Sequence, residues 1–240
     1  MNFWKSWLAR LGGRQPLKHS PRLELELRKW QALPEPDLGR PVNEQRCVVV
    51  DVETTGLNTK QDCLVAIGAV AVSGGAIHID DSFECILRQE TPSDTENILI
   101  HGIATTEQRG GADPAEALIR FLHYAGKDPL LAFHAVFDMA FIERAVHAQL
   151  GIEMRGCWLD LAELAPVVAP ASRAHSLDGW LEYYGIVMTE RHRAMADAVA
   201  TAQLFLMLIP NANRHGGRSV RDLMHLARDH RWFTGKARSR

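Results

Sequence analysis

A chain of 240 residues, 46% hydrophobic and 23% charged, has the composition of a globular protein, which excludes a disordered chain, collagen and a coiled-coil fibre. No apolar run approaches the ~18 residues that span a bilayer, and the first residues lack a secretory signal, so we expect a cytoplasmic protein without integral membrane association. The four cysteines form no CxxC pair, which indicates buried thiols rather than disulfides or a zinc site.

The net charge of −2 hides an uneven distribution along the chain. Residues 1–46 hold nine Lys/Arg and five Asp/Glu, and residues 214–240 hold eight Lys/Arg and two Asp/Glu. Residues 47–213 hold ten Lys/Arg and twenty-two Asp/Glu, a net charge of −12. Clustered carboxylates favour cations and basic ends favour a polyanion, although a solvated surface with two basic tails also explains the pattern.

The sequence predicts three regions along the chain. Short amphipathic helices are expected over 1–11 and 23–30, followed by a proline-containing linker over 33–46. We therefore expect an N-terminal extension and linker over 1–45, one domain over 46–210 and a basic C-terminal tail over 211–240. The extension contains several tryptophans and is expected to pack back on the domain; docking of a partner helix or a membrane surface is the alternative.

Within the domain the pattern predicts strands first and then alternating helices and strands, which is typical of an α/β sheet with an antiparallel hairpin. The expected strands cover 47–51, 64–72, 76–87 and 129–134, with a fifth starting at 157, and the segment 88–104 is expected to be a loop. The expected helices cover 112–126, 137–150, 176–184, 194–209 (ended by Pro210) and 222–229.

Four carboxylates stand at one strand end and at two helix starts. Asp51 and Glu53 follow an apolar strand and point the same way, because residues i and i+2 share a face of a strand. Asp138 lies at the start of a helix after a short strand, and Asp197 lies in the first turns of a later helix. His192, five residues earlier, cannot share a helical face with Asp197, so it belongs in the preceding loop. Each alone could be a surface or capping charge.

Together these residues predict a metal-dependent reaction at a phosphate. Carboxylate oxygens suit Mg²⁺ or Mn²⁺, and two such ions roughly 3.5–4 Å apart can clamp the attacking and leaving oxygens of a phosphoryl displacement. An imidazole can take a proton from water near neutral pH.

Three motifs carry a resemblance to a known family. DVETTG (51–56), FHAVFD (133–138) and HRAMAD (192–197) resemble the exonuclease motifs of the DnaQ-like DEDDh 3′–5′ exonucleases, the superfamily of the polymerase III proofreading ε subunit and RNase T. The segments IHGI (100–103), LDLAELA (159–165) and HSLDGWLEYYGI (175–186) also resemble family stretches. The resemblance covers about 46–210 and implies a ribonuclease H-like α/β fold, with a five-stranded mixed sheet flanked by helices.

The resemblance also implies roles for individual residues. It implies that Asp51, Glu53, Asp138 and Asp197 bind two Mg²⁺ or Mn²⁺ ions and that His192 is the general base. The positions that match substrate contacts in the family are Thr54, Thr55, Gly56, Leu57, His101, Ile103 and Phe137, with His134 in the place of a usual Asn. His134 is explained equally well as a strand-end histidine.

The implied activity is metal-dependent removal of nucleoside 5′-monophosphates from single-stranded 3′ ends, with DNA favoured over RNA. An RNA-trimming exoribonuclease and an inert module that binds nucleic-acid ends or a partner are the alternatives. The sugar preference depends on contacts to the 2′-hydroxyl, which no motif here specifies. The resemblance also allows a polymerase proofreading subunit, with a DNA polymerase as partner, or a stand-alone enzyme.

Overall fold

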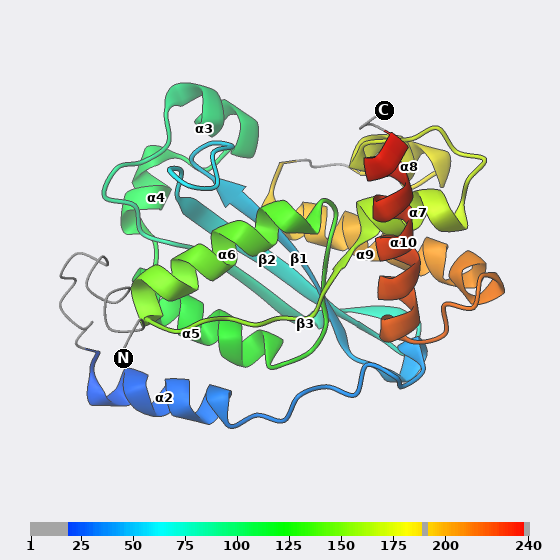
Figure 1. Cartoon of the computed structure of the whole chain (residues 1–240). Coiled ribbons are helices and arrows are strands. Elements are labelled where there is room, and N and C mark those ends of the chain that lie inside the picture. Colours follow the sequence, from blue (N-terminus) through cyan, green and yellow to red (C-terminus); the bar gives the residue numbers. More distant parts are fainter. Residues whose placement is uncertain (1–18, 189–191, 238–240) are drawn as a thin grey trace, which may run out of the picture.

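The structure is a computed structural model that describes residues 19–188 and 192–237, and in the last helix the side chains up to residue 229. The helix expected over 1–11 lies outside these residues. Figure 1 shows one sheet with helices on both of its faces.

A five-stranded mixed sheet forms the centre, as expected. Its strand order is β3-β2-β1-β4-β5. The strands β1 (Cys47–Thr54), β2 (Leu64–Ser73) and β3 (Ala76–Ile86) are antiparallel neighbours, while β4 (Leu130–Ala132) and β5 (Trp158–Asp160) run parallel to β1. The pairing of β4 reaches only Val48 and Val49, so the carboxyl end of β1 is unpaired on that side.

The helices before the sheet's last strand are α2 (Pro21–Gln31), α3 (Thr95–His101), α4 (Thr105–Gly110), α5 (Pro114–Ala125) and α6 (Ala135–Leu150). Those after it are α7 (Leu161–Val168), α8 (Leu177–Tyr183), α9 (Ala194–Arg214) and α10 (Val220–Ala237). The expected helices 23–30, 112–126, 137–150 and 176–184 are confirmed to within a few residues.

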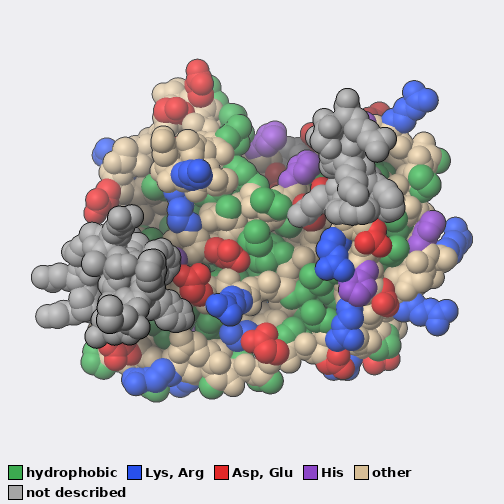
Figure 2. All heavy atoms as spheres, in the orientation of Figure 1, with side chains coloured by type: hydrophobic (Ala, Val, Ile, Leu, Met, Phe, Trp, Pro, Cys, Tyr) green, Lys and Arg blue, Asp and Glu red, His purple; other side chains and the backbone are tan. Residues whose placement is uncertain are grey.

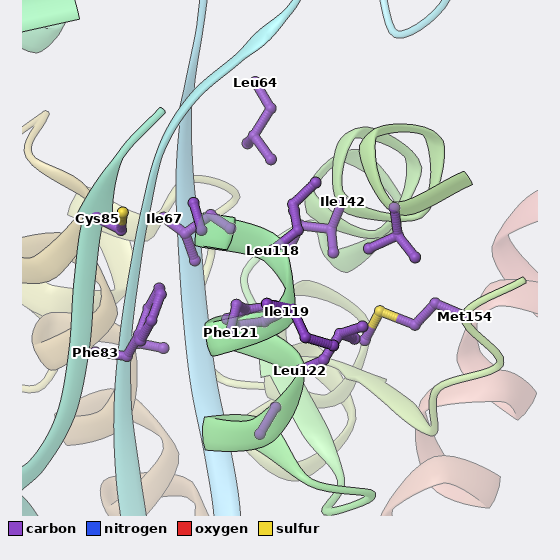
Figure 3. Close-up of a cluster of buried hydrophobic side chains, with 14 of the residues drawn as sticks. Leu64, Ile67, Phe83, Cys85, Leu118, Ile119, Phe121, Leu122, Ile142 and Met154 are labelled. Carbon is purple, nitrogen blue, oxygen red and sulfur yellow. The ribbon is translucent and has the colours of Figure 1, made fainter. Parts of the chain in front are cut away.

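Two apolar cores lie on the two faces of the sheet. Figure 3 shows the first, where side chains of β2 and β3 meet α5 and α6, and α2 also contributes to it. The second joins the opposite face to α7, α8, α9 and α10. The side chains of β1 alternate between them: Val48, Val50 and Val52 point into the first core, whereas Cys47 and Val49 point into the second.

The structure corrects three expectations. The segment 88–104 is not all loop, because Asp94 caps a helical turn by accepting a hydrogen bond from the N–H of Asn97, and α3 and α4 follow. Helix α9 does not end at Pro210 but continues to Arg214. Proline has no N–H for the carbonyl one turn earlier, but Pro210 is exposed, so water can hydrate that carbonyl. Helix α10 is longer than 222–229 and packs on α7, so part of the expected tail belongs to the folded body.

Helix α2 packs back on the domain, as expected for this part of the extension. Leu23, Leu27 and Trp30 are buried in the first core. The Trp30 Nε1–H donates to the Gly126 carbonyl at 2.8 Å, and the Lys127 ammonium lies 3.4 Å from the centre of the indole ring.

Among the described residues, α9 is the one helix long and apolar enough to cross a membrane by length and composition. Half of its most apolar window is buried, and the helix packs on β1 and β2. Its apolar side is therefore accounted for by the second core.

Candidate active site

The end of β1 directs two carboxylates toward one face of the sheet. Asp51 and Glu53 continue the alternation of Cys47 and Val49, so their side chains point to the face that α9 covers. The strand prediction therefore placed the two acids correctly relative to one another. Which helix they would meet depends on the packing of the sheet.

A glycine lets α9 approach these acids closely. Gly68 of β2 lies opposite Asp51 in the sheet register. A Cβ atom at Gly68 would lie 2.2 Å from the backbone C of Ala194 and the backbone N of Met195. Only a residue without a side chain allows this contact between strand and helix start. Gly68 is not among the residues predicted for the site, although a glycine inside an apolar strand is a sign of close backbone approach.

This packing brings Asp197 to the carboxylates of β1. Oxygen atoms of Asp51, Glu53 and Asp197 all lie within 4.8 Å of one another. Asp197 is 6% exposed, and the other two are half-buried. Three carboxylates at this separation repel one another strongly without a cation, and hard oxygen ligands suit Mg²⁺ or Mn²⁺. The residues therefore fit a divalent ion.

Asp138 approaches from the other face of the sheet. It lies in the first turn of α6 and is 4% exposed, and its carboxylate accepts hydrogen bonds from the N–H of Val52 and from its own N–H. Burial raises the pKa of Asp138 well above its usual value, and the nearby charges of Asp160 and Glu53 raise it further. Asp138 is thus adjacent to Glu53 but is not one of the three converging carboxylates. Its role as a metal ligand stays a prediction.

His192 lies in the loop before α9, as its spacing from Asp197 predicted. Its side chain is exposed, and its backbone N–H donates to Asp197 Oδ2 at 3.0 Å. Its φ of 60° is unusual for a residue with a Cβ atom. The hydrogen bond holds the histidine loop to a carboxylate of the cluster, while the imidazole remains accessible to solvent.

A further buried carboxylate holds His134 in place. The His134 N–H donates to Asp160 Oδ1 at 3.0 Å, and the N–H of Ala162 donates to the same oxygen at 3.0 Å. Burial raises the pKa of Asp160, and hydrogen bonds from the backbone of Ala162 and Ala135 oppose this rise. Asp160 lies in the segment 159–165 that resembles the family, but it is not among the residues predicted for the site. Its position directly after an apolar strand is the same signal that identified Asp51.

The loop after β1 is stabilised by its own polar groups. The Thr54 hydroxyl donates to the Gly56 carbonyl at 2.7 Å, and Thr55 Oγ1 accepts a hydrogen bond from the Cys63 N–H at 2.8 Å. A Cβ at Gly56 would lie 2.5 Å from Asp62 Oδ2, so a side chain there would displace the carboxylate that accepts a hydrogen bond from the Asn58 N–H. Leu57 is 85% exposed at the tip.

The segment 100–103 presents different side chains from those expected. His101 and Ile103 are buried, and burial lowers the pKa of His101. His101 Nδ1 accepts from the Ile103 N–H at 3.0 Å, and Nε2 lies 3.2 Å from the Ser93 hydroxyl. Leu99 and Ile100 are the exposed apolar residues here. The predicted contacts of His101 and Ile103 with a nucleotide stay predictions, and both residues hold the segment in shape.

The remaining predicted residues lie at the start of α6. His134 is exposed with a φ of 64°, and its ring centre lies 4.8 Å from that of Phe133. Phe137 is half-buried, and its ring centre lies 4.8 Å from that of Phe141. Figure 2 shows a hollow between the α3 side and the α8 side of the molecule, and histidine side chains lie in it.

Comparison with known proteins identifies a family. The family model described as "Exonuclease" (RNase_T) matches residues 48–205. The chain is 33% identical over 178 residues to the DNA polymerase III PolC-type of Bacillus subtilis, covering 74% of this chain and 12% of the relative. It is 35% identical over 181 residues to a DNA polymerase III subunit epsilon-like protein of Rhodobacter capsulatus, covering 73% of this chain and 25% of the relative. The chain thus spans a small part of these curated relatives.

Solved structures share the fold. Exonuclease X in complex with 5′ overhanging duplex DNA has a TM-score of 0.61 and 22% identity, and the match covers 75% of this chain and 99% of that chain. Exonuclease I of E. coli with a dT13 oligonucleotide has a TM-score of 0.61 and 18% identity, covering 71% of this chain and 42% of that chain. The ribonuclease H-like fold expected from the sequence is confirmed.

Proposed function

This chain belongs to the RNase T exonuclease family, and from that membership we propose that it hydrolyses the last phosphodiester of single-stranded nucleic acid from the 3′ end. The observation that carries the proposal is the convergence of Asp51, Glu53 and Asp197 beside an exposed histidine. The products are a nucleoside 5′-monophosphate and a strand shortened by one nucleotide. DNA is the favoured substrate, because Exonuclease X and Exonuclease I were both solved with DNA.

The carboxylates would hold two divalent ions, Mg²⁺ or Mn²⁺. When bound, such ions neutralise the phosphate and stabilise charge on the attacking and leaving oxygens. Asp51, Glu53 and Asp197 are the ligands that the geometry supports first, and Asp138 completes the set from α6. The raised pKa of Asp138 records the cost of burying this carboxylate next to Glu53, and a nearby cation would relieve that cost.

His192 would act as general base on the attacking water. The imidazole takes one proton as the water oxygen bonds to phosphorus, and the bond from phosphorus to the upstream 3′ oxygen breaks. That oxygen leaves and takes up a proton, so atoms and charge balance. The hydrogen bond from the backbone N–H of His192 to Asp197 keeps the residue next to the cluster and does not involve the imidazole ring, which can therefore reach the water.

The test uses a 5′-labelled single strand with Mg²⁺, Mn²⁺ or EDTA, in DNA and RNA of one sequence. We expect metal-dependent shortening from the 3′ end and a loss of about 10²–10⁴-fold in turnover for His192→Ala. Mg²⁺ should still raise the melting temperature of His192→Ala, because the carboxylates remain. Asp51→Asn should lose both turnover and this thermal shift.

His147→Ala is the matched control, since His147 is an exposed histidine near the other end of α6. Equal turnover for His192→Ala and His147→Ala would refute the general base. Binding of strands without shortening in any metal would instead favour the inert end-binding module. Co-purification with a DNA polymerase would support a proofreading role, which the similarity to the polymerase III relatives suggests.

A further inference from the structure

A cavity of about 450 Å³ lies between α6 and α10, outside the carboxylate cluster. We call it the α6–α10 cavity. Its apolar side is formed by Val136, Met139 and Met224, and its rim carries Arg221, His225 and Arg228. Helix α10 begins beyond residue 205, where the family match ends, so this cavity depends on a part of the chain outside the family domain.

The three basic residues form one exposed face of α10. They stand at i, i+4 and i+7, which places them on the same side of a helix over about 10 Å. The side toward the second core holds Val220, Leu223 and Ala227, which are buried there. Packing on α7 therefore fixes which side of α10 faces outward, and in Figure 2 blue and purple side chains gather over this helix beside α6.

The cavity lies directly beside the candidate active site. Ala135 and Val136 line it and immediately follow His134, while Asp160, which holds the His134 backbone, lines it as well. Asp138 lies on the same first turn of α6. The start of α6 and the end of β5 thus contribute residues both to the cavity and to the candidate site.

The basic charge of the C-terminal region favours a polyanion as the ligand of the cavity. Residues 47–213 carry a net charge of −12 and repel a polyanion, whereas residues 214–240 hold eight Lys/Arg and two Asp/Glu. Three carboxylates near the basic face have other partners. Asp37 lies 3.9 Å from Arg221 with both side chains more than half exposed, and Asp222 is engaged by the N–H groups of Arg218 and Ser219. Asp160, which lines the cavity, accepts hydrogen bonds from the N–H groups of His134 and Ala162.

A second cavity of about 750 Å³ is less suited to a polynucleotide. Its Arg88 is paired with Asp113 at 2.9 Å, and its Arg144 stacks on the ring of Phe141. It lies at the carboxyl end of α6, away from Asp138. Both arginines are therefore engaged within the fold, and the cavity lies at the opposite end of α6 from Asp138.

We propose that the α6–α10 cavity binds the single-stranded polynucleotide upstream of the nucleotide being removed, with phosphates on Arg221, His225 and Arg228 and bases against Val136, Met139 and Met224. This rests on the proposed function and names the path of its substrate. Contacts of this kind bind without sequence preference and depend on salt, because each neutralised phosphate releases counterions.

The test compares Arg221→Glu/Arg228→Glu with Arg22→Glu/Arg28→Glu, which makes the same charge change at exposed positions of α2. Substrates are a single strand of about twelve nucleotides and a dinucleotide, whose single phosphodiester is the one cleaved and which therefore offers no further phosphate to α10. We expect the ratio of KM for the long strand to KM for the dinucleotide to rise about tenfold or more in the α10 variant only. Arg221→Gln/Arg228→Gln should raise the same KM ratio by a smaller factor. Circular dichroism checks that α10 stays folded.

Binding without turnover gives an independent readout. In EDTA, fluorescence anisotropy gives the binding constant of the labelled long strand between about 50 and 200 mM salt. The slope of the logarithm of this constant against the logarithm of the salt concentration should be about one unit shallower in the α10 variant than in the α2 variant. Equal KM ratios and equal slopes for the two variants would overturn the proposal. A wild-type chain that cleaves neither substrate would refute the proposed function, while the anisotropy would still decide whether α10 binds the strand.

Discussion

Single residues of the site combine buried charge with unusual backbone. Among the described residues, the non-glycine positions with positive φ are His134 and His192, at 64° and 60°. Each is held by a hydrogen bond from its backbone N–H to a carboxylate, Asp160 for the first and Asp197 for the second. Such conformations cost about 1–3 kcal/mol and persist where neighbours enforce them. The two carboxylates thus position both histidines.

The buried carboxylate of Asp138 predicts a gain in stability when it is neutralised. Folding raises its pKa, so the ionised form is penalised at every pH above the unfolded-state pKa of about 4, and the penalty shrinks as the pH falls toward that value. In EDTA at neutral pH, Asp138→Asn should raise the melting temperature by about 3–8 °C while activity is lost.

Melting of both proteins between pH 7 and about 4 measures this effect. The difference between Asp138→Asn and wild type should decrease steadily as the pH falls. Saturating Mg²⁺ should also reduce the difference, because only wild type keeps the full ligand set. A lower melting temperature for Asp138→Asn in EDTA at neutral pH would show that the carboxylate stabilises the metal-free fold.

At the scale of elements, the site depends on how closely α9 crosses β2. Gly68 stands opposite Asp51 and meets the backbone of α9 at Ala194 and Met195, three and two residues before Asp197. A methyl group there must move the start of the helix, because the neighbouring atoms are backbone. The carboxylate of Asp197 would move with it.

Gly68→Ala should therefore remove the thermal shift caused by Mg²⁺ and lower turnover by about tenfold or more, since small misplacements at a site are costly. Gly110→Ala is the matched control, because a Cβ there meets nothing within 4 Å and its φ is not positive. Isothermal titration with Mg²⁺ compares the two variants with wild type. Normal Mg²⁺ affinity in Gly68→Ala would show that α9 does not need this contact to present Asp197.

At the scale of the whole molecule, segments outside the family match complete both cores. Helix α2 contributes Trp30 to the first core, and α10 contributes Leu223 to the second. Both cores share one sheet, so the described part of the chain is expected to unfold as one cooperative unit.

This predicts one unfolding transition in urea, with circular dichroism and tryptophan fluorescence coinciding. Trp30→Ala should lower the free energy of unfolding by about 3–5 kcal/mol and move the whole transition to lower urea, because the side chain is 4% exposed and donates to Gly126. Leu25→Ala, on the exposed side of α2, should change it by less than about 0.5 kcal/mol. Separate transitions for the two probes would show that α2 unfolds independently.

The amino-acid sequence by itself predicted the strands and the relative placement of Asp51, Glu53 and His192, while the catalytic roles of these residues stay predictions. These follow from local rules: β-branched runs form strands, alternation puts Asp51 and Glu53 on one face, and spacing keeps His192 outside the helix of Asp197. The segment 94–101 escaped prediction because its helix begins at a capping residue, Asp94, within a stretch that reads as loop.

Only the tertiary structure decided which groups meet. The contact at Gly68, the carboxylate of Asp160 under His134 and the outward face of α10 join residues far apart in the chain. Local periodicity carries no information about such contacts, because they depend on which faces of the sheet the helices cover. The burial of His101 has the same origin, since the ring contacts Ser93 and Ile103 only once the segment 93–103 has folded.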